Sequence, residues 1–239
     1  MTVVILAGGR SLRMGSDKAF LQFGGESFVS IIANELLEIS DDVIVVVGTK
    51  DPREFVKEVD DKRVRFMNDE RCTSNPLGGM ITGFEAANDK YAAVVACDLP
   101  LVRKRLISNL FEAAEGRDGA VPIWNPSVRF SMEPLCAVYH TQSMIKAINR
   151  SLARGEAGCK KVVMTLKDVD YVPVSELREF DPELSSLRNV NTQEDYIELL
   201  KELKPPVLVE TVARKTETAI VRPQLRSGST ENFYVESRG

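Results

Sequence analysis

The sequence predicts an α/β fold in which helices cover both faces of a mostly parallel β-sheet. Short apolar runs alternate with helix-like patterns along the chain, which is typical of βαβ units. Few polar residues interrupt these runs, as expected of strands that are buried on both faces. At 239 residues the chain is long enough for one α/β domain with a sizeable core.

The first half of the chain carries the clearest elements. Residues 3–6 and 43–47 are apolar and predict strands, and Ser27 is suited to cap a helix that runs between them to about Ile39. Asp51-Pro52 predicts another helix start, because aspartate accepts bonds from free amides and proline fits the first turn. Two further strands, at 64–67 and 91–96, and a helix at 78–88 are expected after it.

The segment from Leu6 to Leu21, LAGGRSLRMGSDKAFL, predicts a phosphate-binding loop. It follows a strand directly, and Gly8 and Gly9 remove the side chains that would keep a phosphate from the backbone amides. Three cations and another glycine follow closely, at Arg10, Arg13, Gly15 and Lys18. Several positive charges can therefore converge on one polyanion. The alternative, a glycine-rich surface turn, does not account for the cations.

Two common phosphate motifs are excluded. In a Walker A loop, Lys and Ser/Thr follow the last glycine directly, whereas Ser16 and Asp17 separate Gly15 from Lys18 here. The glycines also lack the G-x-G-x-x-G spacing of dinucleotide-binding dehydrogenases. A P-loop NTPase and a Rossmann dehydrogenase are both poor interpretations of this chain.

Gly8, Thr49, Asp69 and Asp98 each follow a predicted strand. Because ligands of open α/β sheets bind at the carboxyl ends of the strands, these residues are expected to line one crevice. Asp98 follows an apolar run and precedes Pro100, which suits a carboxylate that holds Mg²⁺ against nucleotide phosphates. The alternatives are that Asp98 caps the next turn and that Asp69 is a solvated loop charge.

Composition restricts the remaining classes. The formal net charge of −4 argues against nonspecific nucleic-acid binding, and no apolar run reaches membrane-spanning length. The first residues enter a strand without a charged leader region, so a cytoplasmic protein is expected. No C-x-x-C pair occurs, so the cysteines are expected to be reduced and mostly buried; they are Cys72, Cys97, Cys136 and Cys159.

The pattern LAGG-x-S-x-RMG-x-x-K resembles the signature of the molybdenum cofactor guanylyltransferases. Four further segments match that family in the same order: NPLGGM at 75–80, VVACDLPLV at 94–102, MEPLCAVY at 132–139 and RNVNTQEDY at 188–196. The resemblance covers about residues 1–203. It implies the three-layer nucleotidyltransferase fold with a mostly parallel, Rossmann-like central sheet.

The resemblance implies transfer of GMP from GTP to the terminal phosphate of molybdopterin or the molybdenum cofactor, with Mg²⁺ as cofactor and pyrophosphate as the second product. It implies molybdoenzymes or other cofactor-biosynthesis proteins as further partners. Arg13, Lys18 and Asp98 would be catalytic, with Asp98 as metal ligand. The nucleotide would be bound by Leu6, Ala7, Gly8, Gly9, Arg13, Lys18, Asp69 and Asp98, and the acceptor by Glu133, Asn189 and Asn191.

The acceptor phosphate is already anionic at neutral pH, so the reaction requires no general base. This agrees with a single histidine, His140, which is expected at the surface. Glu133 has the alternative of simply ending a strand, and Thr192 with Asp195 matches a helix capping box.

Three alternatives stay open. Relatives that transfer CMP tend to carry Ala-Gly where this chain has Gly8-Gly9, which favours GTP and leaves CTP as the nearest competitor. The acceptor could instead be a sugar 1-phosphate, or the fold could serve as a noncatalytic nucleotide-binding module. Residues 204–239 form a C-terminal extension that departs from the family, with a hairpin or partner-binding arm expected near 207–225 and a loose tail after it.

Overall fold

The computed structural model describes residues 1–9, 17–69, 75–156 and 158–203. The expected C-terminal extension, Arg13 and Cys72 lie outside these ranges. The strands are β1 (Thr2–Leu6), β2 (Gln22–Phe23), β3 (Glu26–Ser27), β4 (Asp42–Gly48), β5 (Val64–Asn68), β6 (Tyr91–Ala96), β7 (Gly119–Ile123), β8 (Cys136–His140) and β9 (Val169–Pro173). Short 3₁₀ turns occur at Lys18–Phe20, Arg129–Ser131 and Ser185–Leu187.

The α-helices are α1 (Phe28–Leu36), α2 (Pro52–Val56), α3 (Pro76–Ala86), α4 (Lys104–Ala114), α5 (Thr141–Ala153), α6 (Cys159–Val163), α7 (Val174–Leu177) and α8 (Gln193–Lys201). They cover both sides of a seven-stranded sheet in the order β5-β4-β1-β6-β8-β7-β9. All neighbours run parallel except β8, which is antiparallel to both β6 and β7. The prediction of a three-layer α/β fold with a mostly parallel central sheet is therefore confirmed.

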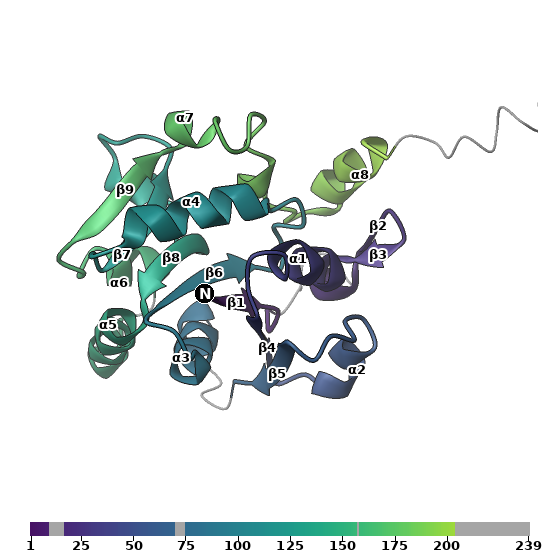
Figure 1. Ribbon diagram of the computed structural model, residues 1–239, viewed down its shortest axis with the longest axis horizontal. Coiled ribbons are helices and arrows are strands. Elements are labelled where there is room, and N and C mark those ends of the chain that lie inside the picture. Colours follow the sequence, from purple (N-terminus) through teal and green to yellow (C-terminus); the bar gives the residue numbers. More distant parts are fainter. Residues whose placement is uncertain (10–16, 70–74, 157, 204–239) are drawn as a thin grey trace, which may run out of the picture. The chain divides into compact units, whose positions relative to one another are not determined.

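The alternation of side chains along the central strands divides the core into two layers. Val3 and Ile5 of β1 face a cluster that includes residues of α1 and α4, whereas Val4 faces one that includes residues of α3 and α5. Figure 1 shows α1 and α4 on one side of the sheet and α3 and α5 on the other. Since both faces are covered, the strands carry the uninterrupted apolar runs from which they were predicted.

Helix α3 begins and ends two residues earlier than the sequence analysis expected. Its first turn is fixed by Asn75, whose side chain accepts from the Leu77 amide at 2.9 Å, and by Pro76 at the first helical position. At the other end Ala87 adopts an extended backbone. Helix α1 also ends before Ile39, because the Ile39 amide bonds the Leu36 carbonyl and so tightens the last turn.

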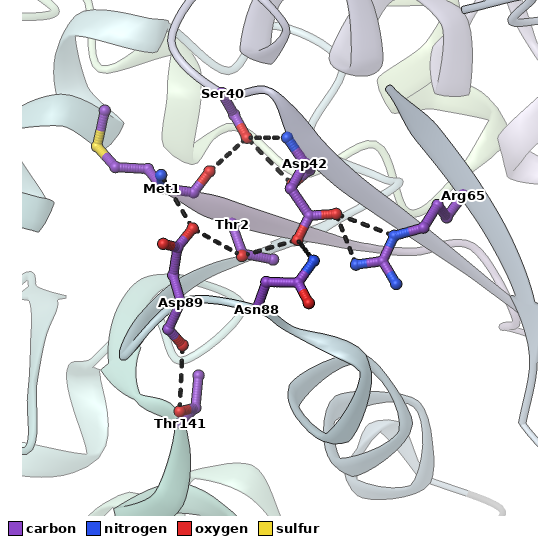
Figure 2. Close-up of polar contacts among 8 residues, drawn as sticks. All are labelled: Met1, Thr2, Ser40, Asp42, Arg65, Asn88, Asp89 and Thr141. Atoms are coloured by element: carbon purple, nitrogen blue, oxygen red, sulfur yellow. Dashed lines mark hydrogen bonds and ion pairs between the residues drawn. The ribbon is translucent and has the colours of Figure 1, made fainter. Parts of the chain in front are cut away.

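At the amino-terminal edge of the parallel strands, side chains from several loops and strand starts form a polar network (Figure 2). Asp42, at the start of β4, accepts from Arg65 Nε and Nη2 at 3.0 and 2.6 Å. The hydroxyl of the fully buried Thr2 lies 2.9 Å from Asp42 Oδ2 and 3.0 Å from Asp89 Oδ2. These contacts connect the starts of β1 and β4 to β5 and to the loop before β6.

Candidate active site

The carboxyl end of β1 packs against the end of β4 through two glycines. A Cβ atom on Gly8 would lie 2.7 Å from the Gly48 nitrogen and 2.8 Å from its Cα, so a side chain at Gly8 would require the backbone to move. Gly48 itself has a φ of +65°, a conformation that favours glycine. Among the described residues, no atom lies within 4 Å of a Cβ placed on Gly9. The two glycines of the predicted loop therefore have different surroundings.

Leu6 and Ala7 are held by the neighbouring strand ends. The Ala7 amide donates to the Val46 carbonyl at 2.9 Å, and the Leu6 carbonyl accepts from the Cys97 amide at 3.1 Å. The end of β1 is thus bonded on one side to β4 and on the other to the segment that leads to Asp98.

Lys18, Asp98 and Asn191 lie together although 80 and 173 positions separate Lys18 from the other two. Lys18 Nζ is 3.4 Å from Asp98 Oδ2 and donates to Asn191 Oδ1 at 2.7 Å. The Val190 amide donates to the Asp98 carbonyl oxygen at 2.8 Å, which ties the segment containing Asn189 and Asn191 to the end of β6. A cation, a carboxylate and an amide from three distant segments thus converge at one edge of the sheet.

Asp98 does not cap a helix. Helix α4 begins at Lys104, and its cap residue, Arg103, makes no side-chain cap bond. Oxygen Oδ1 of Asp98 is buried and has no hydrogen-bond partner among the described residues. Burial raises the pKa of the Asp98 carboxyl, and Lys18 opposes part of that rise. A buried carboxylate oxygen without a donor in the described part of the chain fits a ligand for a hard divalent cation.

Asp69 is buried rather than solvated, contrary to the alternative interpretation. Its amide donates to the Gly48 carbonyl at 2.9 Å, and its Oδ1 accepts from the Thr82 hydroxyl of α3 at 3.3 Å. Asp69 therefore lies directly beside the Gly8–Gly48 contact. Asp69 follows β5 and so lies at the carboxyl edge of the sheet, next to the end of β4.

The described contacts do not join Glu133 to the Lys18 cluster. Glu133 precedes β8, where its Oε1 accepts from the Trp124 indole nitrogen at 2.8 Å and its amide donates to the Pro122 carbonyl. His140 is half-buried, and its Nδ1 accepts from the Ser143 amide at 3.2 Å and caps α5. Its role in these contacts is structural.

Lys50 is a residue of this edge that the sequence analysis missed. Its Nζ donates to the Ala7 carbonyl at 2.5 Å and lies 2.6 Å from Asp17 Oδ2. The signal was present in the sequence, because Lys50 follows the same strand as Thr49 and so belongs to the same edge of the sheet.

The buried thiol of Cys97 lies within the electrostatic field of this group. Burial raises the pKa of Cys97 to about 12, and the charges of Asp98, Lys50, Asp17 and Lys18 all act on it. Cys97, Cys136 and Cys159 are free and buried, as expected. No helix in the described part of the chain is long and apolar enough to span a membrane.

Comparison with known proteins identifies related enzymes and folds. A family model described as a MobA-like NTP transferase domain matches residues 3–169. A protein of Methanosarcina mazei named as a probable molybdenum cofactor guanylyltransferase is 34% identical over 211 residues, with 86% of this chain and 92% of that protein covered. A molybdenum cofactor guanylyltransferase of Desulfosudis oleivorans is 30% identical, with coverages of 82% and 92%.

Solved structures show the same fold. Molybdopterin-guanine dinucleotide biosynthesis protein A from Archaeoglobus fulgidus matches with a TM-score of 0.70 at 24% identity, covering 84% of this chain and 97% of its own. The 2-C-methyl-D-erythritol 4-phosphate cytidylyltransferase of Thermus thermophilus matches with a TM-score of 0.62 at 15% identity, covering 83% and 96%. The chain is a nucleotidyltransferase and belongs to the MobA-like NTP transferase family.

Proposed function

We propose that the protein transfers GMP from GTP to the terminal phosphate of molybdopterin or the molybdenum cofactor and releases pyrophosphate. The observation that carries the proposal is the cluster of Lys18, Asp98 and Asn191 at the carboxyl edge of the sheet, beside the end of β1. The names of the relatives in Methanosarcina mazei and Desulfosudis oleivorans support the choice of substrates.

In the proposed reaction an oxygen of the acceptor phosphate attacks the α-phosphorus of GTP, and the bond to the bridging oxygen of the pyrophosphate breaks. The acceptor is already an anion, so the protein need not remove a proton. Its task is to align two polyanions and to offset their charge. Lys18 supplies a fixed positive charge, and the resemblance assigns a second one to Arg13, which is outside the described residues.

We propose Mg²⁺ as the metal, with Asp98 as its protein ligand. Oδ1 of Asp98 has no hydrogen-bond partner within the described ranges, which supports this assignment. Mg²⁺ commonly takes one or two carboxylates together with water and substrate phosphates. Bound there, the ion would neutralise charge on the nucleotide phosphates. Lys18 would then hold the second oxygen of Asp98 and keep the carboxylate oriented.

Asp69 is proposed to contact the guanosine portion, and Asn189 and Asn191 the acceptor. Asn191 already bonds Lys18, so the acceptor segment and the nucleotide cation meet at this point. Glu133 remains a proposed acceptor residue on the strength of the resemblance alone.

We also propose cytoplasmic localisation, with molybdoenzymes or other cofactor-biosynthesis proteins as recipients of the product.

The test supplies purified protein, Mg²⁺ and molybdenum-loaded pterin cofactor with GTP or CTP in separate reactions. Pyrophosphate release and product mass are measured. The guanine dinucleotide product with GTP alone is expected. Product with CTP alone would keep the reaction type and overturn the choice of base, whereas nucleotide binding without product would favour a noncatalytic module or another acceptor, such as a sugar 1-phosphate.

A further inference from the structure

Lys50 contacts two described residues of the nucleotide loop, Ala7 and Asp17. Ala7 is the last residue before Gly8-Gly9, and Asp17 immediately precedes Lys18. The Lys50 ammonium contacts both, at 2.5 Å from the Ala7 carbonyl oxygen and 2.6 Å from Asp17 Oδ2. The Lys50 and Asp17 side chains are only 21% and 26% exposed, so solvent screens this ion pair less than a pair on the open surface.

Asp17 in turn fixes the turn that carries Lys18. While Oδ2 pairs with Lys50, Oδ1 accepts from the Ala19 amide at 3.1 Å and caps the 3₁₀ turn Lys18–Phe20. Each oxygen of this carboxylate therefore has a separate partner. Holding Asp17 in place holds the first residue of the turn, Lys18, whose ammonium points to Asp98 and Asn191.

Each of the two lysines pairs with a different carboxylate: Lys50 with Asp17, and Lys18 with Asp98. An unpaired Asp17 would compete with Asp98 for the neighbouring Lys18 ammonium, and its negative charge would repel a triphosphate. Lys50 Nζ is also 5.7 Å from the centroid of the buried Phe55 ring, which steadies the side chain.

We propose that Lys50 is a positioning residue of the nucleotide site, which neutralises Asp17 and ties it to the end of β1 so that Lys18 faces Asp98. The proposal rests on the proposed function in that the ligand is a nucleoside triphosphate. Lys50 acts through Asp17 and Ala7 and need not touch the nucleotide.

The test is a charge-rescue series read by calorimetric titration with Mg·GTP. Lys50→Met keeps the apolar stem beside Phe55 and removes the ammonium, so Asp17 is left uncompensated and affinity is expected to fall about tenfold or more. Lys50→Arg should bind within about threefold of the unchanged protein. Adding Asp17→Asn to Lys50→Met should restore affinity to within about threefold of Asp17→Asn alone, because asparagine can still cap the turn without a charge.

A purely structural role for Lys50 would not produce this recovery. Unchanged affinity in Lys50→Met, or a double variant as weak as Lys50→Met itself, would overturn the proposal. Amide hydrogen exchange at Ala19 in nucleotide-free protein tests the positioning step separately: Lys50→Met should speed it, and equal rates would contradict the proposal. If the unchanged protein binds Mg·GTP but forms no guanylylated pterin, the proposed function fails while the Lys50 series still gives its answer.

Discussion

At the residue scale, the two glycines of the nucleotide loop differ in packing. Gly8 packs against Gly48, whereas Gly9 has no close neighbour among the described residues. The sequence analysis connected Gly8 with the choice between GTP and CTP. The structure shows that Gly8 contacts Gly48 closely enough to exclude a side chain unless the backbone moves. Glycine at position 8 therefore has a physical reason in this chain that does not depend on the base.

Gly8→Ala should accordingly destabilise the protein by about 1–3 kcal/mol, the usual cost of overpacking a close contact. Gly9→Ala is the matched control and should change stability by no more than about 0.5 kcal/mol, since no atom of the described residues lies within 4 Å of the added methyl group. Urea unfolding of both variants makes the comparison. Equal free energies of unfolding for the two would contradict the packing role of Gly8.

At the element scale, the start of α8 connects helix capping to the candidate site. Thr192 Oγ1 accepts from the Asp195 amide at 3.2 Å, and Asp195 Oδ2 accepts from the Thr192 and Asn191 amides, both at 2.8 Å. This is the capping box predicted from the sequence. Because it holds the backbone of Asn191, the cap also orients the residue that bonds Lys18.

Thr192→Ala should cost about 1 kcal/mol of stability through loss of the cap, whereas Thr192→Ser, which keeps the hydroxyl, should cost less than half of that. Both free energies can be measured by denaturant unfolding. A serine variant as unstable as the alanine variant would show that the threonine methyl group, rather than the cap, makes the contribution.

The cap also predicts a pH dependence. Hydrogen bonds from the Asn191 and Thr192 amides lower the pKa of Asp195 below its usual value. The ionised Asp195 carboxylate therefore contributes fully to stability above its unfolded-state pKa of about 3.9. This contribution is lost as the pH falls through the lower pKa that Asp195 has in the folded protein. Asp195→Asn should flatten the fall in stability in this acid range, and an unchanged acid profile would contradict the assignment.

The sequence predicted elements best where local chemistry sets their boundaries. Asp51-Pro52 and the Thr192 capping box begin helices as expected. The direction of β8 was not predicted, because a buried apolar run has the same pattern in parallel and antiparallel strands. Lys50 was missed for a related reason: its partners are Asp17 and a backbone carbonyl, and only the folded chain places them beside it.

At the scale of the compact unit Met1–Leu203, the described residues form separate polar clusters at the two edges of the sheet. The carboxyl edge collects the Lys18, Asp98 and Asn191 cluster, and the amino edge holds the Asp42 network of Figure 2. In the second network the charges of Asp42 and Arg65 are paired at 2.6 Å. Substitutions at the two edges should therefore affect different properties of the protein.

Asp42→Ala should lower the free energy of unfolding by about 1–3 kcal/mol, because it removes acceptors from Thr2, Arg65 and Asn88. Turnover measured well below the melting temperature should stay within about twofold of the unchanged protein, an energetic difference of less than about 0.5 kcal/mol. Unfolding and pyrophosphate-release assays on the same preparation provide both values. A large loss of turnover with unchanged stability would contradict this division of the two edges.

We propose that Lys18 and Asp98 belong to the nucleotidyl-transfer site. Burial raises the pKa of the Asp98 carboxyl. The charged carboxylate therefore lowers the stability of the folded protein instead of adding to it. Loss of either side chain should therefore affect chemistry much more than folding. Arg117→Ala is a suitable control, because it also breaks an ion pair. Arg117 Nη1 lies 3.0 Å from Asp168 Oδ1, and neither residue belongs to the Lys18 cluster.

The most direct measurement is the steady-state rate of pyrophosphate release from GTP and the pterin acceptor for Lys18→Ala and Asp98→Ala, with urea unfolding of each variant. Turnover should fall by about 10²–10³-fold, as when a charge-stabilising group is lost from an active site. Stability should change by less than about 1 kcal/mol, and Arg117→Ala should keep normal turnover. Near-normal turnover in either site variant would contradict the account.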